Sequence, residues 1–191
     1  MGGAAAGVFV LSVLCATQVQ GGGRSSPPRL GVTAGWFKPN TLAAQASVSP
    51  FDSVASAPCC GVQLSTPEFS GTTLRLSGGL WTWRNHGPLT MVPLALDVKH
   101  DLIQGLPFRP YVVYGGAAYW GWEGRWRDVA RRSADARGWG ATLGVGLDVH
   151  LSRHWSVAAE FDYLYVMFKR ELGGARDYSG PRLVLGMNYG F

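Results

Sequence analysis

An alternation of apolar residues with small or polar residues recurs along this chain and continues to its last residue. In the final segment, apolar side chains occupy every second position, at Leu183, Leu185, Met187, Tyr189 and Phe191. Because successive side chains of a β-strand point to opposite faces, this pattern predicts a strand with one apolar face. Such a strand fits two architectures, since the apolar face points inward in a soluble barrel and outward to lipid in a membrane barrel.

Seven earlier segments also have strand-like patterns, so about eight strands are expected. Several have the ~9–11 residues that a tilted membrane-spanning strand needs. The segment 109–122 has aromatic residues on both parities, so its facing is ambiguous. The expected strands cover residues 29–37, 60–65, 72–83, 90–99, 109–122, 139–151, 155–168 and 182–191.

The connections between these segments differ in length. Those after the first, fifth and seventh strands are long or charged, and those after the second, fourth and sixth are tight. Only the connection after the third strand is short where a long one is expected. Short turns at one end and longer loops at the other are typical of membrane barrels. Charged residues make up 15% of the chain, against about a quarter in soluble domains.

Aromatic residues give an independent indication. Tryptophan favours the interface between hydrocarbon and headgroups, so two aromatic belts at opposite strand ends indicate a bilayer. The alternative architecture is a soluble ligand-binding barrel, which does not explain why aromatic residues gather at the strand ends. The belt at the loop ends is predicted to contain Trp36, Trp81, Trp83, Trp120, Trp122 and Trp139, and the belt at the turn ends Tyr111, Trp155, Tyr189 and Phe191.

These features together resemble the small outer-membrane barrels of the OmpA type. The resemblance covers about residues 29–191 and is carried by "GLPFRPYVVYGGAAYW", "LSRHWSVAAEFDYLY" and "GPRLVLGMNYGF". It implies an all-β fold, an eight-stranded antiparallel up-and-down transmembrane β-barrel in the bacterial outer membrane. It also implies that Gly186, Tyr189 and Phe191 belong to a C-terminal signal that the outer-membrane insertion machinery reads.

The first residues form a separate region. An apolar run from Ala4 to Ala16 is followed by small residues, which predicts a cleaved signal peptide over residues 1–21 and a short linker over 22–28. The alternative for this run is a buried apolar strand or helix. Of the later cysteines, Cys59 and Cys60 are adjacent, and adjacent cysteines lack the spacing of a metal site. A vicinal disulfide, an intermolecular disulfide and an inert loop feature remain open for them.

The inward parity of the expected strands carries charged and titratable side chains of both signs. The interior of an eight-stranded barrel is just wide enough for side chains to fill it. Buried charges must be paired, so the pattern predicts an interior polar network of salt bridges rather than a catalytic cluster. Its expected members are Arg75, Asp97, Lys99, Asp148, His150, Glu160, Asp162 and Arg182.

The basic loop before the sixth strand is the most promising candidate for a surface function. Arginine binds phosphate through a bidentate fork, and lipopolysaccharide phosphates lie at the level expected for this loop. The alternative is a solvated loop whose charges serve solubility. The candidate phosphate contacts are Arg125, Arg127, Arg131, Arg132 and Arg137.

We therefore expect no enzyme, no cofactor and no metal, and a structural or loop-mediated role in envelope integrity or surface binding. The expected partners are outer-membrane lipid, lipopolysaccharide and the insertion machinery; the basic residues form no nucleic-acid recognition motif. A narrow pore or small-ligand carrier is the alternative function. A lipid A-modifying enzyme using His150 and Ser152 is disfavoured, because the parity of both points inward and both lie at the turn end.

Overall fold

The computed structural model describes residues 27–40, 57–84, 88–103, 106–124 and 135–191, apart from the side chains of Trp83 and Arg84. The predicted signal peptide lies outside these residues. Nine strands follow one another along the described chain. They are β1 (Arg29–Phe37), β2 (Ala57–Ser65), β3 (Thr72–Arg84), β4 (Pro88–Asp101), β5 (Phe108–Glu123), β6 (Ala136–His150), β7 (Trp155–Leu172), β8 (Ala175–Asp177) and β9 (Gly180–Gly190).

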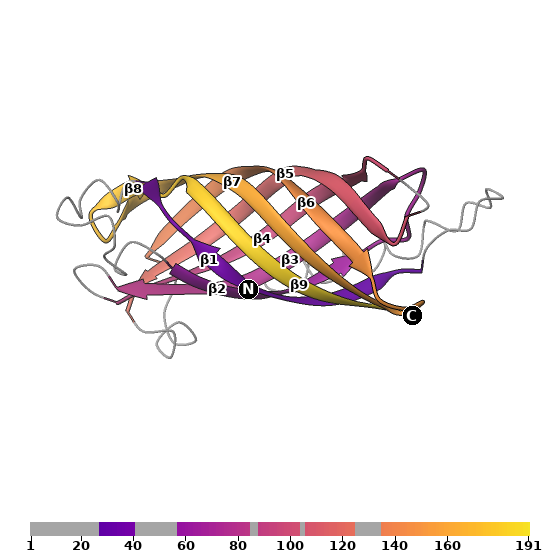
Figure 1. The fold of residues 1–191 in the computed structure, drawn as a ribbon. Helices are drawn as coiled ribbons and strands as arrows, with labels where there is room; N and C mark the ends of the chain where they lie inside the picture. The colour runs from indigo at the N-terminus through magenta and orange to yellow at the C-terminus, as the bar shows by residue number, and fades with distance from the viewer. Residues whose placement is uncertain (1–26, 41–56, 85–87, 104–105, 125–134) are drawn as a thin grey trace, which may run out of the picture.

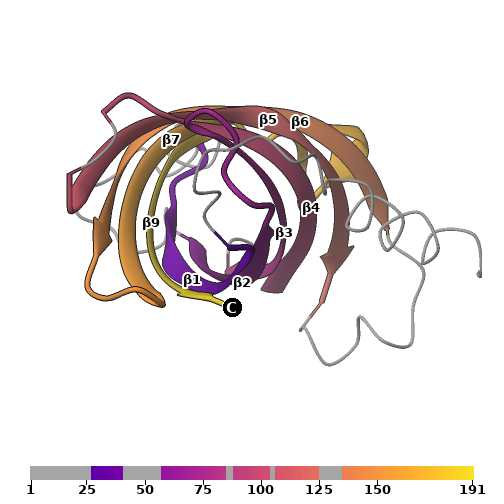
Figure 2. The same ribbon diagram turned by 90° about the vertical axis from the view of Figure 1, so that its right-hand side faces the viewer.

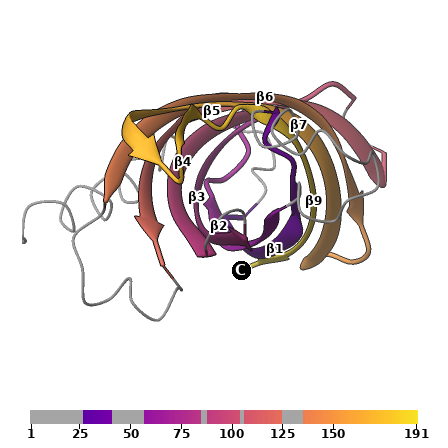
Figure 3. The ribbon, with the colours of Figure 1, turned by 90° about the vertical axis from the view of Figure 1, so that its left-hand side faces the viewer.

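Eight of these strands close into an antiparallel up-and-down barrel, which confirms the fold expected from the sequence (Figure 1). Each is hydrogen-bonded to the next in chain order, and β9 pairs with both β7 and β1. The closing pair runs in register from Arg29 opposite Gly190 to Phe37 opposite Arg182. Figures 2 and 3 look along the axis from the two ends and show the closed ring. Full closure removes the free edges that an open sheet exposes.

The remaining strand, β8, has three residues and pairs only with the outer part of β7. It belongs to the connection between β7 and β9, at the loop end of the barrel (Figure 1). Gly173 and Gly174 begin this connection with φ angles of 58° and 85°. Glycine adopts this left-handed backbone without the penalty that a Cβ imposes. These two glycines therefore allow β7 to reverse direction within a tight turn.

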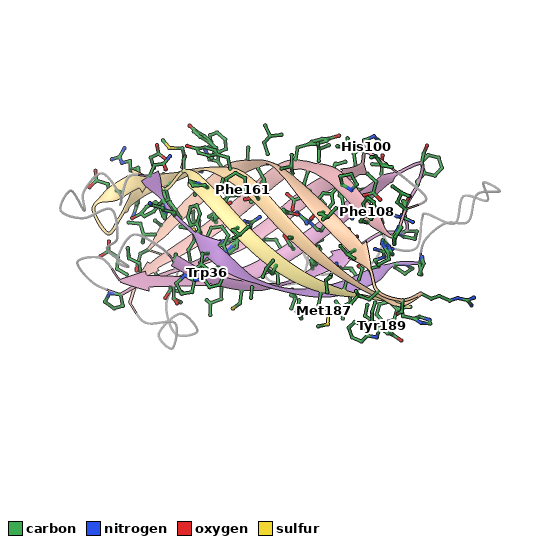
Figure 4. The ribbon with its side chains drawn as sticks, viewed as in Figure 1. Trp36, His100, Phe108, Phe161, Met187 and Tyr189 are labelled. Carbon is green, nitrogen blue, oxygen red and sulfur yellow. The ribbon has the colours of Figure 1, made fainter. Side chains whose placement is uncertain are left out.

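The apolar face of the barrel points outward. Leu143 is 69% exposed, Trp36 59% and Val32 58%, although each is a large hydrophobic side chain on a regular strand. Figure 4 shows Trp36 toward the loop end and Tyr189 toward the turn end. In water this continuous apolar surface would carry a large hydrophobic cost, which a lipid environment removes. The outward direction excludes the soluble-barrel alternative, which places the apolar residues inside.

The structure resolves the facing of β5, which was ambiguous from its sequence. Tyr111, Val113 and Tyr119 point inward and are buried, whereas Tyr114 points outward and is 49% exposed. The expected position of Tyr111 in the turn-end belt is therefore wrong. Its ring fits inside because Gly146 of β6 faces it, and a Cβ at Gly146 would overlap the phenol.

The adjacent cysteines point to opposite sides of β2. Cys59 is buried inside the barrel and Cys60 is exposed on the outer face, and both thiols are free. This arrangement follows from strand alternation and disfavours a vicinal disulfide.

Candidate functional site: the barrel interior and its two ends

A charge cluster occupies the middle of the lumen and is centred on Arg75 of β3. Its Nη1 lies 2.6 Å from Oε2 of Glu160 on β7, and its Nη2 lies 3.2 Å from Oδ2 of Asp97 on β4. The hydroxyl of Tyr111 donates a 3.0 Å hydrogen bond to Glu160. Arg75 thus ties together strands from opposite sides of the ring.

A second arginine extends this cluster toward the loop end. Arg182 of β9 lies 2.7 Å from Asp162 and 3.6 Å from Glu160, both on β7. On its other side, the guanidinium carbon lies 5.7 Å from the centre of the Trp81 ring. Arg182 therefore joins the polar middle of the lumen to the aromatic residues beyond it.

A third group of charges lies at the turn end. Lys99 is 2.8 Å from Asp148, which Arg29 of β1 also contacts at 3.2 Å. The other Nη atom of Arg29 is 2.7 Å from Nε2 of His150. Nearby, Arg109 lies 2.8 Å from Glu68 and 3.6 Å from Asp101. Each contact joins a cation to a group from another strand or turn, so the cluster ties the wall together at this end.

All eight residues expected in the interior network occur on inward-facing positions. Arg75, Asp97, Asp148, Glu160 and Asp162 are buried, and the other three are partly buried. Further members of the same clusters were not predicted from the sequence. Arg29 shares the inward parity of Gly31 and was detectable from alternation, whereas Tyr111 was not. The missed residues are Arg29, Glu68, Asp101, Arg109 and Tyr111.

An aromatic cluster fills the loop end of the lumen. Trp81 lies at its centre, with ring centroids 5.0 Å from Phe37 and 5.8 Å from Tyr119. Phe168 continues the chain of contacts at 6.4 Å from Tyr119 and 5.7 Å from Tyr178. We call these five residues the aromatic plug. The expectation that Trp81 belongs to the lipid-facing belt is wrong, because it is 3% exposed and has inward parity.

Tyr178 closes the aromatic plug from the outer connection. Its hydroxyl donates to the backbone carbonyl of Leu172, and its ring is fully buried. Burial, together with the nearby Glu123 carboxylate, raises the pKa of Tyr178 to about 12. The phenol therefore stays neutral at physiological pH and keeps its hydrogen bond.

The spaces left between these side chains are small. Three neighbouring cavities in the lumen have volumes of about 40 Å³ each. The first lies at the turn end between Arg29 and Lys99, and the second lies beside Trp81 and Arg182. Spaces of this size hold a few water molecules rather than a metabolite.

The chain end forms an aromatic group at the turn end. The Tyr189 ring lies 5.0 Å from Trp155 and 5.6 Å from Phe191, centroid to centroid. β9 ends at Gly190, but the backbone N–H of Phe191 still donates a 3.3 Å hydrogen bond to the carbonyl of Pro28. Phe191 is 66% exposed, which is expected for an aromatic ring that contacts the membrane interface. Gly186 faces inward beside Thr33.

The side chains suggested for lipid A chemistry have other partners. His150 contacts Arg29, and the Ser152 hydroxyl accepts hydrogen bonds from the backbone N–H groups of His154 and Trp155. Within the described ranges, no cluster of three or more His, Cys, Asp or Glu side chains is arranged to hold a metal ion. The same residues contain no helix long and apolar enough to cross a membrane.

Of the five arginines proposed to contact phosphate, four lie outside the described residues: Arg125, Arg127, Arg131 and Arg132. The fifth, Arg137, is exposed on the outward face of β6.

The closed barrel with an outward apolar face is the fold of the small eight-stranded outer-membrane β-barrels. Neisserial surface protein A (NspA) matches with a TM-score of 0.64 over 87% of this chain and 98% of its own, at 10% identity. The outer-membrane protein OprG of Pseudomonas aeruginosa matches with a TM-score of 0.59 over 88% of this chain and 98% of its own, at 13% identity.

The N-terminal barrel domain of OprF from Pseudomonas aeruginosa matches with a TM-score of 0.53 over 88% of this chain and all of that chain, at 17% identity. At these identities the matches establish the fold. No protein-family model matches the chain, and no curated protein sequence matches it.

Proposed function

We propose that this chain is an integral protein of the bacterial outer membrane whose barrel is closed and non-conducting. Its role is structural, or is carried out by the loops that the barrel holds at the cell surface. In this proposal residues 1–21 direct secretion, and the motif containing Gly186, Tyr189 and Phe191 directs assembly by the insertion machinery.

The observation that carries this proposal is the double closure of the lumen. Arg75 bridges Glu160 and Asp97 in the middle, and the aromatic plug fills the loop end. An ion crossing the barrel would have to separate buried ion pairs and displace packed rings. Buried charges are costly to leave unpaired and packed rings are costly to displace, so both features oppose conduction.

Membrane placement is supported by the outward apolar face and by the exposed aromatic residues at both ends. Trp36 and Trp139 are more than half exposed toward the loop end, and Trp155 is 45% exposed at the turn end. Among the matched structures are a neisserial surface protein and Ail, the attachment invasion locus protein of Yersinia pestis, which matches with a TM-score of 0.50 over 87% of this chain and 98% of its own, at 12% identity. These names favour a surface role over catalysis.

A narrow pore is the second candidate, and one observation favours it. The three lumen cavities share polar lining residues, with Arg75 and Gln63 common to the first and third, and Arg182 and Ser77 common to the second and third. If the side chains between them rearranged, a water-filled path would follow this row.

Conductance across a lipid bilayer distinguishes the two. The purified chain is refolded into phospholipid vesicles, insertion is verified by protease protection, and the vesicles are fused with a planar bilayer. A closed barrel gives no current steps above those of protein-free vesicles. Reproducible steps of constant size in the wild-type protein would overturn the non-conducting proposal and favour the pore.

A further inference from the structure

We propose that the outward face of β5, β6 and β7 binds a phosphorylated, multiply acylated glycolipid of the lipopolysaccharide type at its loop end. This inference rests on the proposed outer-membrane location and assigns a site to the lipid. The site consists of two cations, Arg137 and Lys169, which we call the basic rim, above a group of outward aromatic rings.

Strand register places the two cations side by side. Gly138 of β6 is opposite Phe168 of β7, so Arg137 and Lys169 occupy the next position toward the loop end. Both have outward parity and both are exposed. Neighbouring strands lie about 4.8 Å apart, so the two long side chains reach the same small volume.

The basic rim differs from the cations of the lumen in having no carboxylate partner among the residues that the structure describes. Each interior arginine or lysine of the charge clusters contacts an acidic side chain. Within the part of the chain that the structure describes, neither Arg137 nor Lys169 has such a contact. The nearby Glu171 is paired with Arg176 at 3.7 Å. Two adjacent cations repel each other, and a bound phosphate group relieves that repulsion.

Aromatic rings lie directly beside and below the rim. Trp120 of β5 is opposite Arg137, and Trp139 lies two residues further toward the bilayer centre on β6. The Trp139 ring is 5.5 Å from that of Tyr165 on β7, centroid to centroid, and both rings are exposed. Indole and phenol rings mark the level where acyl chains meet headgroups. The cations therefore lie at the height of headgroup phosphates in the outer leaflet.

Small outward residues lie beside these rings, which leaves room for acyl chains. Ala118 is opposite Trp139, and Gly116 and Ala141 lie in one row between the larger Leu96 and Tyr165 of the flanking strands. A lipid with several acyl chains under one phosphorylated headgroup matches this arrangement of cations above rings and small residues.

Binding of a phosphorylated lipid A by the refolded full-length chain in detergent tests the site. Its affinity is compared with that for the same lipid after enzymatic removal of the phosphates, and for phosphatidylglycerol. The double variant Arg137→Gln, Lys169→Gln is compared with Arg153→Gln, which removes an exposed cation from the turn at the opposite end.

The proposal expects the double variant to bind phosphorylated lipid A about tenfold more weakly, because two charge-assisted contacts are lost. Arg153→Gln should bind like the wild type, and removing the phosphates should weaken wild-type binding to a similar extent. Unchanged affinity in the double variant would overturn the site. Equal wild-type affinity for the two forms of lipid A, or for phosphatidylglycerol, would overturn the choice of ligand.

Failure of this proposal is distinguishable from failure of the proposed function. Insertion into phospholipid vesicles is measured on the same preparations without lipid A. Correct insertion together with phosphate-independent binding would reject the basic rim alone. A chain that does not insert would reject the membrane location itself. The comparison of the two forms of lipid A uses the wild-type protein, so it does not depend on the folding of any variant.

Discussion

Arg75 of β3 and Glu160 of β7 form a 2.6 Å ion pair across the barrel, between strands on opposite sides of the ring. The arginine also contacts Asp97 of the neighbouring strand β4. A single side chain therefore connects three strands through the interior. This contact holds the two opposite walls of the narrow polar lumen together.

Replacing Arg75 should destabilise the barrel strongly. Arg75→Met leaves the buried Glu160 and Asp97 without their principal cation, and removing one partner of a buried pair costs ~3–5 kcal/mol. Arg153→Met, at an exposed turn position, should change the free energy of unfolding by less than about 0.5 kcal/mol. Urea unfolding of the protein in lipid vesicles measures both. A change for Arg75→Met as small as that for Arg153→Met would show that the lumen is well solvated.

The pair of Arg75 and Glu160 also predicts that the stability losses of two substitutions are not additive. Arg75→Met combined with Glu160→Leu removes both charges and keeps most of the volume, and such replacements of buried pairs are often close to neutral. The double variant should therefore lose less stability than the sum of the two single variants. Additive losses would mean that the two side chains do not interact in the lumen.

The interior position of Trp81 can be tested with lipids that quench fluorescence. In variants that retain one tryptophan, Trp139 should be quenched by lipids brominated in the acyl chain, because its ring is 56% exposed on the outer face. Trp81 should be quenched much less, because it is enclosed by Phe37 and Tyr119. Quenching of Trp81 as strong as that of Trp139 would place it in the lipid-facing belt after all.

Replacing Trp81 with alanine tests how much the aromatic plug stabilises the barrel. Trp81→Ala removes the central ring of the aromatic plug and should cost ~3–5 kcal/mol in the free energy of unfolding in vesicles. Trp36→Ala on the outer face of β1 is the matched control and should cost less, because lipid chains fill the space that the ring leaves. Equal losses would argue against a packed plug.

Phe191 is predicted to act mainly in assembly. Deletion of Phe191, or Phe191→Asp, should lower the amount of protein in outer-membrane fractions several-fold. Refolding of the purified chain into detergent should suffer much less, because losing one interfacial ring costs at most ~1.5–3 kcal/mol. Arg153→Asp, a change at an exposed turn position, is the control. Normal cellular assembly of both Phe191 variants would show that the chain end is not read as a signal.

The direction of the strand faces could be predicted from the sequence because it depends only on alternation. Leu30, Val32 and Trp36 share one parity, and Arg75 and Asp97 occupy the other parity of their strands. The partner of Arg75 could not be predicted, because contacts across the lumen depend on how the strands are staggered around the ring. Trp81 was wrongly assigned to the lipid-facing belt because tryptophan favours membrane interfaces. Its inward parity instead places the ring inside the barrel. β5 stayed ambiguous because aromatic residues occupy both of its faces, Tyr111 and Tyr119 on one and Tyr114 and Trp120 on the other.

The most direct test of a closed transmembrane barrel is its behaviour on a denaturing gel with and without heating. A barrel without free edges resists detergent until it is boiled, because every strand keeps its neighbours. We predict that the chain refolded in detergent runs at different positions before and after boiling, and that vesicle-inserted protein does the same. Identical mobility in a sample whose circular dichroism shows folded β-sheet would contradict the closed barrel.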